Sequence, residues 1–371
     1  MSIPSIQQIP TAGKRVLVRV DFNVPLAPDG SISDDSRIRA SLPTISYLLA
    51  QGASVILMSH LGRPKGPSDL KYSLKNCAER LSVFLKRPVF FGSHKTMKPG
   101  EVLLLENLRF HPEEENGDIT FAKQLSQFGD VYINDAFGTS HRAHASTVTI
   151  AQFFPGRKAA GLLLQKEIKF LGDALIRPER PFYAIIGGSK VSSKLAILKA
   201  LVTKADALFI GGAMAYTFLK AQGFSVGGSL VEKNLEKEAL SLLSSGKIFL
   251  PIDHVTMDGK EVVGSIPQDA RGADIGPKTI QEWTERLKGA KTIFWNGPLG
   301  IFEDPRFEMG THKIALAITS GNAMTIVGGG DSISAIEQQG LSSKITHLST
   351  GGGAALEFIE KGSLPGIHAL E

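Results

Sequence analysis

Short apolar runs alternate with longer amphipathic segments along the whole chain. The runs cover residues 15–20, 54–58, 102–105, 131–133, 182–186, 207–210, 292–295 and 324–327. Each run has the length of a β-strand, and the segments between most of them have room for a helix. Apolar strands separated by helices are typical of parallel βαβ units in which both faces of the sheet are covered. The pattern therefore predicts an α/β protein.

A boundary between two such regions is predicted near residues 155–180. Segment 161–175 has helical periodicity, and the stretch Arg-Pro-Glu-Arg-Pro at 177–181 carries two prolines that would end a helix. We interpret this region as a long connecting helix between two α/β domains. The length of 371 residues agrees, because a domain takes about 150 residues. In the first domain, Pro43 suits the first turn of a helix that Gly52 would end.

Composition and charge exclude several classes of protein. A single cysteine, Cys77, rules out an internal disulfide and suits a reducing compartment. The net charge of +5 permits anionic ligands without requiring nucleic acid. No apolar stretch reaches about 18 residues and no secretory signal is visible, so we expect a cytoplasmic protein without a membrane span.

Glycine and arginine are distributed unevenly. Of the 39 glycines, 26 follow residue 180, whereas 9 of the 15 arginines precede residue 157. Guanidinium groups bind carboxylates and phosphates in a bidentate manner, and clustered glycines let backbone N–H groups approach phosphates. The bias suggests a small anion in the first domain and a nucleotide in the second.

In the first half, polar and basic residues recur after the predicted strands. They are Asp21, Asn23, Arg37, His60, Arg63, Arg109 and Arg142. Each alone has an ordinary explanation as a turn residue or a solvated side chain, but together they would form a basic cradle for an anion. His141 and His144 are three residues apart, yet nothing nearby completes a zinc site. The acidic residues 113–115 are expected to form a solvated turn.

In the second half, glycine pairs and triplets follow the predicted strands. Lys190 and Lys194 follow Gly187–Gly188 and are expected on one helical face. The triplet 328–330 precedes Asp331, which could hold Mg²⁺ with phosphate oxygens or could simply cap a helix. The triplet 351–353 repeats this design. Neither a Walker A loop nor a G-x-G-x-x-G fingerprint is present.

Eight motifs, in this order, resemble the phosphoglycerate kinase family over about residues 14–367. They are RVDFNVP, SHLGRPKG, LENLRFHPEEE, NDAFGTSHRAH, GGSKVSSKL, NGPLGIFE, GGGDS and STGGGAALEF. The resemblance implies two doubly wound, Rossmann-like parallel-sheet domains joined by a helix and hinge. It also implies reversible phosphoryl transfer from 1,3-bisphosphoglycerate to ADP, giving 3-phosphoglycerate and MgATP in glycolysis.

The resemblance assigns a role to each matching position. Substrate-binding residues would be Asp21, Asn23, Arg37, His60, Arg63, Arg109 and Arg142. Nucleotide-binding residues would be Lys194, Glu303, Gly329, Gly330, Asp331 and Ser332. Asp331 would hold Mg²⁺ with the nucleotide phosphates. Arg37 and Lys190 would be the catalytic residues that stabilise charge on the transferred phosphoryl group.

Domain boundaries also follow from the resemblance. The N-terminal, phosphoglycerate-binding domain would cover residues 1–158, and an interdomain helix would cover 159–176. The nucleotide-binding domain would cover 177–354, and the C-terminal segment 355–371 would pack back on the first domain. Compared with the family, Ser189 and Ser332 stand where alanine and threonine are common. The chain also looks shortened near 93–97 and 252–274.

A carboxylate acceptor is already ionised at pH 7, since its pKa is about 4, so this chemistry needs no general base. Because each reactant would bind a separate domain, we expect the domains to close for in-line transfer and to exclude water. We expect a monomer that binds small molecules and no nucleic acid. Two alternatives are a nicotinamide-dependent α/β oxidoreductase and a non-enzymatic anion-binding protein.

Overall fold

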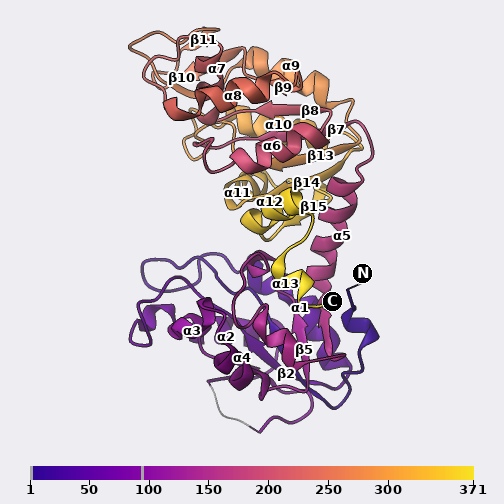
Figure 1. Cartoon of the computed structure of the whole chain (residues 1–371). Helices are drawn as coiled ribbons and strands as arrows, with labels where there is room; N and C mark the ends of the chain where they lie inside the picture. The colour runs from indigo at the N-terminus through magenta and orange to yellow at the C-terminus, as the bar shows by residue number, and fades with distance from the viewer. Residues whose placement is uncertain (1–2, 93–95) are drawn as a thin grey trace. The chain divides into compact units, whose positions relative to one another are not determined.

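The computed structural model describes residues 3–92 and 96–371, which divide into two compact units (Figure 1). Unit 1 comprises Met1–Lys169 and Ser363–Glu371, and unit 2 comprises Phe170–Gly362. The boundary falls within helix α5 (Leu162–Ile176), where the periodicity predicts a helix. The shortened segment expected near 93–97 includes residues 93–95, which lie outside the described residues. No helix in the described ranges is both long and apolar enough to cross a membrane.

Unit 1 is built on a parallel sheet of six strands in the order β3-β4-β2-β1-β5-β6. The strands are β1 (Arg15–Arg19), β2 (Ser54–Met58), β3 (Val89–Phe91), β4 (Val102–Leu104), β5 (Val131–Asn134) and β6 (Lys158–Ala160). The chain runs from β1 toward one edge and then returns to place β5 on the other side of β1. Ligands of open parallel sheets bind beyond the carboxyl ends of the strands at such a reversal.

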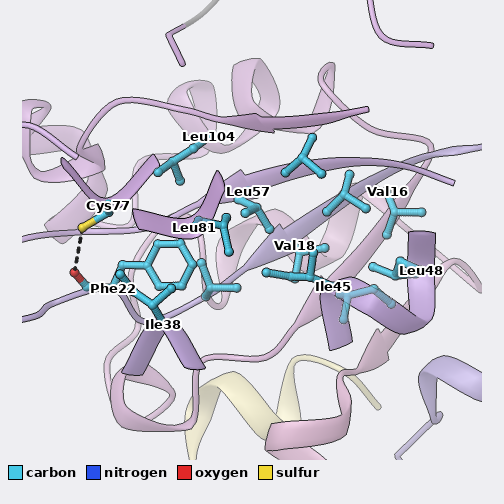
Figure 2. Packing of buried hydrophobic residues seen from close by; sticks show 14 of the residues in the cluster. Val16, Val18, Phe22, Ile38, Ile45, Leu48, Leu57, Cys77, Leu81 and Leu104 are labelled. Carbon is cyan, nitrogen blue, oxygen red and sulfur yellow. Dashed lines mark hydrogen bonds between the residues drawn. The ribbon is translucent and has the colours of Figure 1, made fainter. Parts of the chain in front are cut away.

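Helices of unit 1 bury an apolar core against this sheet. The helices are α1 (Ser36–Ala50), α2 (Lys75–Leu85), α3 (Pro112–Glu115), α4 (Ile119–Ser126) and α13 (Pro365–His368), with the first part of α5. Figure 2 shows Val16 and Val18 of β1 packed near Ile45 and Leu48 of α1. Cys77 is buried in the same cluster as an unpaired thiol, and burial raises its pKa to about 12.

Strand β1 is buried from Val16 onward, including Arg19. This agrees with the prediction of a parallel sheet covered on both faces, because the polar residues of such a strand do not reach solvent. The expectation that Pro43 lies in the first turn of its helix is wrong. Helix α1 begins at Ser36, so Pro43 lies inside it and Arg37 lies in its first turn. Tertiary packing therefore outweighs the helix-breaking effect of this proline.

The carboxyl end of β5 contacts both the start of α5 and the C-terminal residues of the chain. Asp135 follows β5, and its Oδ1 accepts hydrogen bonds from the backbone N–H groups of Leu163 and Leu164 at 2.9 and 3.2 Å, at the start of α5. The C-terminal residues pack on the same region. The Asn134 side-chain amide donates to the Gly366 carbonyl at 3.2 Å, and Gly366 N–H donates to the Ser140 carbonyl at 2.8 Å.

Unit 2 has a second six-stranded parallel sheet, in the order β15-β14-β13-β7-β8-β9, and a small antiparallel sheet, β11-β10-β12. The strands are β7 (Phe182–Ile186), β8 (Ala207–Ile210), β9 (Ile248–Phe249), β10 (Asp253–Thr256), β11 (Glu261–Val263), β12 (Gly272–Ile275), β13 (Thr292–Asn296), β14 (Met324–Gly328) and β15 (His347–Ser349). The strand order of the large sheet reverses between β7 and β13. The crevice for a ligand is therefore expected where these two strands end.

Unit 2 also has helices between and after its strands. They are α6 (Leu195–Lys204), α7 (Met214–Ala221), α8 (Glu236–Leu243), α9 (Pro277–Leu287), α10 (Met309–Thr319), α11 (Gly330–Gln338) and α12 (Gly352–Lys361). Trp283 of α9 and Trp295 of β13 are fully buried in the main core cluster of this unit. The two parallel sheets with their helices confirm the predicted α/β class with two Rossmann-like units.

Candidate active site

In unit 1, the loops after β1 and β2 bring the first group of predicted site residues together. Asp21 pairs with Arg37, with 2.8 Å between Oδ2 and Nη1. Asn23 Oδ1 accepts a hydrogen bond from Gly62 N–H at 2.8 Å, which ties the two loops. Burial alone would raise the pKa of Asp21, but the positive charge of Arg37 more than offsets this and helps to hold the pKa below its ordinary value. The carboxylate is therefore held ionised beside the Arg37 guanidinium group.

The loop after β4 joins the same cluster through Arg109. Its Nη1 donates to the Gly62 carbonyl at 2.6 Å, and its Nε lies 3.2 Å from Glu115 Oε1. Burial lowers the pKa of Arg109, although the neighbouring carboxylate of Glu115 opposes this. Arg63 lies in the Gly/Pro loop and is exposed. One site thus contains both fixed and solvent-facing guanidinium groups.

The loop after β5 contributes Arg142, which is exposed. Its charge lowers the pKa of both Arg109 and His144, as expected for a cation near this cluster. His144 is buried, and burial first, then the surrounding arginines, lower its pKa to about 4. No group of three potential metal ligands occurs in residues 3–92 or 96–371. His144 is therefore a neutral imidazole among the arginines of this cluster.

Sequence reasoning missed a buried network beneath this cluster. Glu114, expected in a solvated turn, is fully buried, and its carboxylate accepts from Ser146 Oγ at 2.6 Å and Ser146 N at 3.0 Å. Arg19 is also fully buried, and its Nε donates to Ser146 Oγ at 2.7 Å. The only sequence signal is a charged residue inside an apolar strand, at Arg19, because Glu114 looks like its exposed neighbours.

In unit 2, the carboxyl ends of three neighbouring strands meet. The register places Asn296 of β13 opposite Ile186 of β7 and Gly328 of β14. Asn296 is buried, and its amide donates to the Gly328 carbonyl at 2.8 Å. The loops that follow these strands therefore leave the sheet side by side, at the point where the strand order reverses.

Lys194 joins two of these loops. Its Nζ donates to the Gly187 carbonyl at 2.7 Å, the Asn296 carbonyl at 3.1 Å and Asn296 Oδ1 at 2.7 Å. Burial lowers the pKa of Lys194 to about 8, and the charge of Asp331 partly opposes this. The expectation that Lys190 and Lys194 share a helical face is wrong, because α6 begins at Leu195. Lys190 instead lies exposed in the glycine-rich loop.

Several glycines here are required by backbone packing. A Cβ on Gly187 would lie 2.0 Å from the Pro298 carbonyl oxygen, and one on Gly352 would lie 2.8 Å from Gly329 Cα. The loops therefore approach one another more closely than any side chain allows. By contrast, a Cβ on Gly330 or Gly353 would meet nothing within 4 Å. Packing thus explains part of the glycine excess, and Gly330 and Gly353 are glycines that it does not explain.

Three helix N-termini open onto this edge. Helices α6, α11 and α12 begin without a side-chain cap hydrogen bond. Asp331 in the first turn of α11 is exposed, as is Glu303 in the loop after β13. Ser332 is fully buried, and its Oγ accepts from Gly297 N–H at 2.6 Å. Uncapped helix starts with a nearby lysine are suited to phosphate groups.

The sheet edges of the two units indicate the class of protein. One unit has a basic, arginine-rich edge and the other a glycine-rich edge with helix N-termini, which is the arrangement of a two-domain α/β phosphotransferase. The chain belongs to the phosphoglycerate kinase family: the family model "Phosphoglycerate kinase" matches residues 6–362. It is therefore an enzyme that transfers a phosphoryl group reversibly between 1,3-bisphosphoglycerate and ADP in glycolysis. Neither the oxidoreductase nor the non-enzymatic alternative is favoured.

Individual relatives agree along the full length. The chain is 51% identical to a phosphoglycerate kinase of Anaeromyxobacter dehalogenans and 52% identical to one of Borrelia turicatae, with 100% of each chain covered. The solved structure of phosphoglycerate kinase from Coxiella burnetii is 37% identical and has a TM-score of 0.90, and the match covers 100% of this chain and 99% of that chain. That from Pyrococcus horikoshii is 33% identical with a TM-score of 0.86 and 98% coverage of both chains.

The alignments with these relatives are longer than the chain itself. The alignments extend over 396 and 394 positions, whereas the chain has 371 residues. The relatives therefore contain residues that have no counterpart here.

Proposed function

We propose that unit 1 binds the phosphoglycerate and unit 2 binds the nucleotide. The observation that carries this proposal is the convergence of the predicted basic residues on one sheet edge. Gly62 connects them, because its N–H is held by Asn23 and its carbonyl by Arg109. Seven matching positions come from one unit and contribute to this edge: Asp21, Asn23, Arg37, His60, Arg63, Arg109 and Arg142. Guanidinium and imidazole groups at one edge suit a ligand with a carboxylate and a phosphate.

For the nucleotide, we assign binding to Lys194, Glu303, Gly329, Gly330, Asp331 and Ser332. The uncapped starts of α6, α11 and α12 support this assignment, because backbone N–H groups at a helix N-terminus attract phosphate. The buried Ser332 hydroxyl holds Gly297 N–H, so Ser332 shapes the loop as well.

The donor set at Asp331 fits Mg²⁺ bound together with a nucleotide. A single exposed carboxylate starts α11, and no group of three candidate metal ligands lies in the described ranges. Mg²⁺ commonly takes one or two carboxylates and completes its shell with phosphate oxygens and water. Asp331 would hold the ion, which when bound neutralises charge on the phosphates.

Arg37 and Lys190 are the proposed catalytic residues. The Arg37 side chain is 34% exposed and Lys190 is exposed, so both can reach a ligand. In the free protein Arg37 is held by Asp21, which orients its guanidinium group in advance. Phosphoryl transfer to or from a carboxylate needs alignment and charge stabilisation and no general base. The two cations would offset charge on the oxygens of the transferred group.

The decisive assay is ATP-dependent phosphorylation of 3-phosphoglycerate, with and without Mg²⁺. We expect Arg37→Ala to lower kcat about 100- to 1,000-fold, the loss typical of a preorganised donor. Arg39→Ala is the matched control, since Arg39 lies on the same helix and pairs with Asp35. Near-normal turnover of Arg37→Ala, or equal losses in both variants, would contradict the assigned role.

Because the two sites belong to different units, we propose that the units close when both reactants are bound. Small-angle scattering with 3-phosphoglycerate and a nonhydrolysable ATP analogue should show a smaller radius of gyration than either ligand alone. An unchanged radius would contradict closure.

A monomer in the cytoplasm, without a nucleic-acid partner, completes the proposal. One chain carries both proposed sites, and the modest net charge of +5 does not call for a polyanion. Analytical ultracentrifugation at working concentrations tests the oligomeric state.

A further inference from the structure

Arg19 is the last residue of β1 and is fully buried under the basic cluster. Its three guanidinium nitrogens have separate partners. Nε donates to Ser146 Oγ, Nη1 donates to the Val20 carbonyl, and Nη2 lies 3.3 Å from His60 Nδ1. Since the Arg19 side chain is only 1% exposed, it is shielded from a ligand bound at the surface of the site. Any influence on the reaction must pass through the groups it holds.

Glu114 fixes the guanidinium group in place. Its Oε1 lies 3.9 Å from Arg19 Nη2, and both its oxygens accept hydrogen bonds from Ser146. Ser146 Oγ therefore donates to Glu114 and accepts from Arg19. The chain Glu114–Ser146–Arg19 is satisfied at each link, as a buried ionic group requires.

The contact with His60 determines where that imidazole carries its proton. A guanidinium group has donors only and stays protonated in proteins. The nitrogen that faces it, Nδ1, must therefore be the acceptor, so the proton of a neutral His60 is on Nε2. The opposite tautomer would point Nδ1–H at a guanidinium N–H.

The charges around His60 also favour a neutral ring. Burial is the main cause that lowers the pKa of His60 well below its ordinary value. The neighbouring cations Arg19 from β1, Arg109 from the loop after β4 and Arg37 from α1 act in the same direction, and Asp21 opposes them. The ring therefore has one donor, Nε2–H, and one acceptor that is already in use.

We propose that Arg19, held by Glu114 and Ser146, is a positioning residue that locks His60 in the Nε2–H tautomer so that it donates to an anionic oxygen of the phosphoglycerate. This role rests on the proposed binding of phosphoglycerate in unit 1. It deepens that proposal, because it makes His60 a neutral donor and not a cation in the site.

Nuclear magnetic resonance of the ¹⁵N-labelled histidine rings of the full-length enzyme tests the tautomer directly. We expect His60 in the wild type to be purely Nε2–H between pH 6 and 9. Arg19→Gln should mix the two tautomers, because a glutamine amide can present either its oxygen or its nitrogen to Nδ1. Arg15→Gln is the matched control, since Arg15 lies on the same strand but is exposed and pairs with Asp130. A wild-type Nδ1–H ring, or an Arg19→Gln ring identical to wild type, would overturn the proposal.

Kinetics give an independent readout that does not depend on the stability of an Arg19 variant. The side-chain amide nitrogen of glutamine can stand in for Nε2 of histidine, and that of asparagine for Nδ1. We therefore expect His60→Gln to keep KM for 3-phosphoglycerate within about threefold of wild type, and His60→Asn to raise it at least tenfold. The reverse order would contradict the tautomer assignment.

The same spectra separate this proposal from the proposed binding site. If adding 3-phosphoglycerate leaves the His60 signals unmoved, unit 1 does not bind it there and the proposed function fails. If the signals move but the ring is Nδ1–H, the binding site stands and the role of Arg19 fails.

Discussion

Asp274 of β12 offers a direct test of how burial controls charge in unit 2. Its side chain is enclosed so tightly that a Cβ on Gly300 or Gly310 would lie 2.2 or 2.3 Å from Oδ1. Oδ2 accepts from Gly310 N–H at 2.6 Å and Oδ1 accepts from Ile275 N–H at 2.8 Å. Burial raises the pKa of Asp274 to about 7, and the two N–H donors oppose this rise only in part.

The consequence for stability has a definite sign. An aspartate in the unfolded chain ionises near pH 3.8, so from pH 5 the native state holds about one proton more than the unfolded state, and this excess decreases as the pH approaches 7. The free energy of unfolding therefore falls by up to about 1.4 kcal/mol per pH unit, or about 2 kcal/mol between pH 5 and 7, and levels off above this window. Asp274→Asn cannot titrate. Its amide nitrogen cannot accept a hydrogen bond, which adds a pH-independent cost of about 1–3 kcal/mol.

Urea unfolding followed by tryptophan fluorescence measures this effect at pH 5, 6, 7 and 8. The chain has two tryptophans, Trp283 and Trp295, and both lie in the core of unit 2, so the signal reports that unit. We expect the unfolding free energy of Asp274→Asn to rise by about 2 kcal/mol relative to that of the wild type between pH 5 and 7. Asp269→Asn, at an exposed position of the same unit, should show no such gain. Parallel pH curves for Asp274→Asn and wild type would refute the reasoning.

Two further predictions concern the loops of unit 2. The pKa of Lys194 is about 8, and phosphates of a bound nucleotide would stabilise its ammonium form. The affinity for ADP, measured by calorimetry, should therefore fall up to tenfold per pH unit above pH 8. A Lys194→Met variant with the same pH dependence would contradict this. Ser332→Ala leaves Gly297 N–H without its acceptor and should cost about 1–3 kcal/mol of unfolding free energy by tryptophan fluorescence. The exposed Ser343→Ala should cost nothing measurable, and equal losses would argue against the buried hydrogen bond.

The glycine-rich edge of unit 2 shows how far spacing along the chain can lead. Strands do lead into the glycine-rich segments at 187–188, 296–297 and 328–330, as predicted, although β13 and β14 each include one residue more, Asn296 and Gly328. Spacing along the chain does not distinguish glycines that let a ligand approach the backbone from glycines that let two loops pack closely. Gly187 is excluded from bearing a side chain by Pro298, more than 100 residues away, whereas Gly330 faces open space. Their local sequence contexts are alike, so only the fold distinguishes them.

Lysine and arginine positions illustrate the same limit. The pattern predicts a helix that includes both Lys190 and Lys194. Helix α6 instead begins at Leu195, so Lys190 lies outside the helix and Lys194 is its N-cap residue. Likewise, Pro43 suggested a helix start that in fact lies at Ser36, and this change places Arg37 on a helix. Helix ends depend on which backbone groups find tertiary partners, and periodicity does not report those partners.

The sequence by itself determined the α/β class, the helix near residues 161–175 and the order of motifs after the strands, because apolar period and motif spacing are local properties. Only the tertiary structure decided which charges are buried. Arg19 contacts Ser146, which lies 127 residues later in the sequence. Glu114 differs from its solvated neighbours only because its carboxylate faces Ser146. The fate of a charged side chain depends on partners that supply its hydrogen bonds, and those partners are brought together by folding alone.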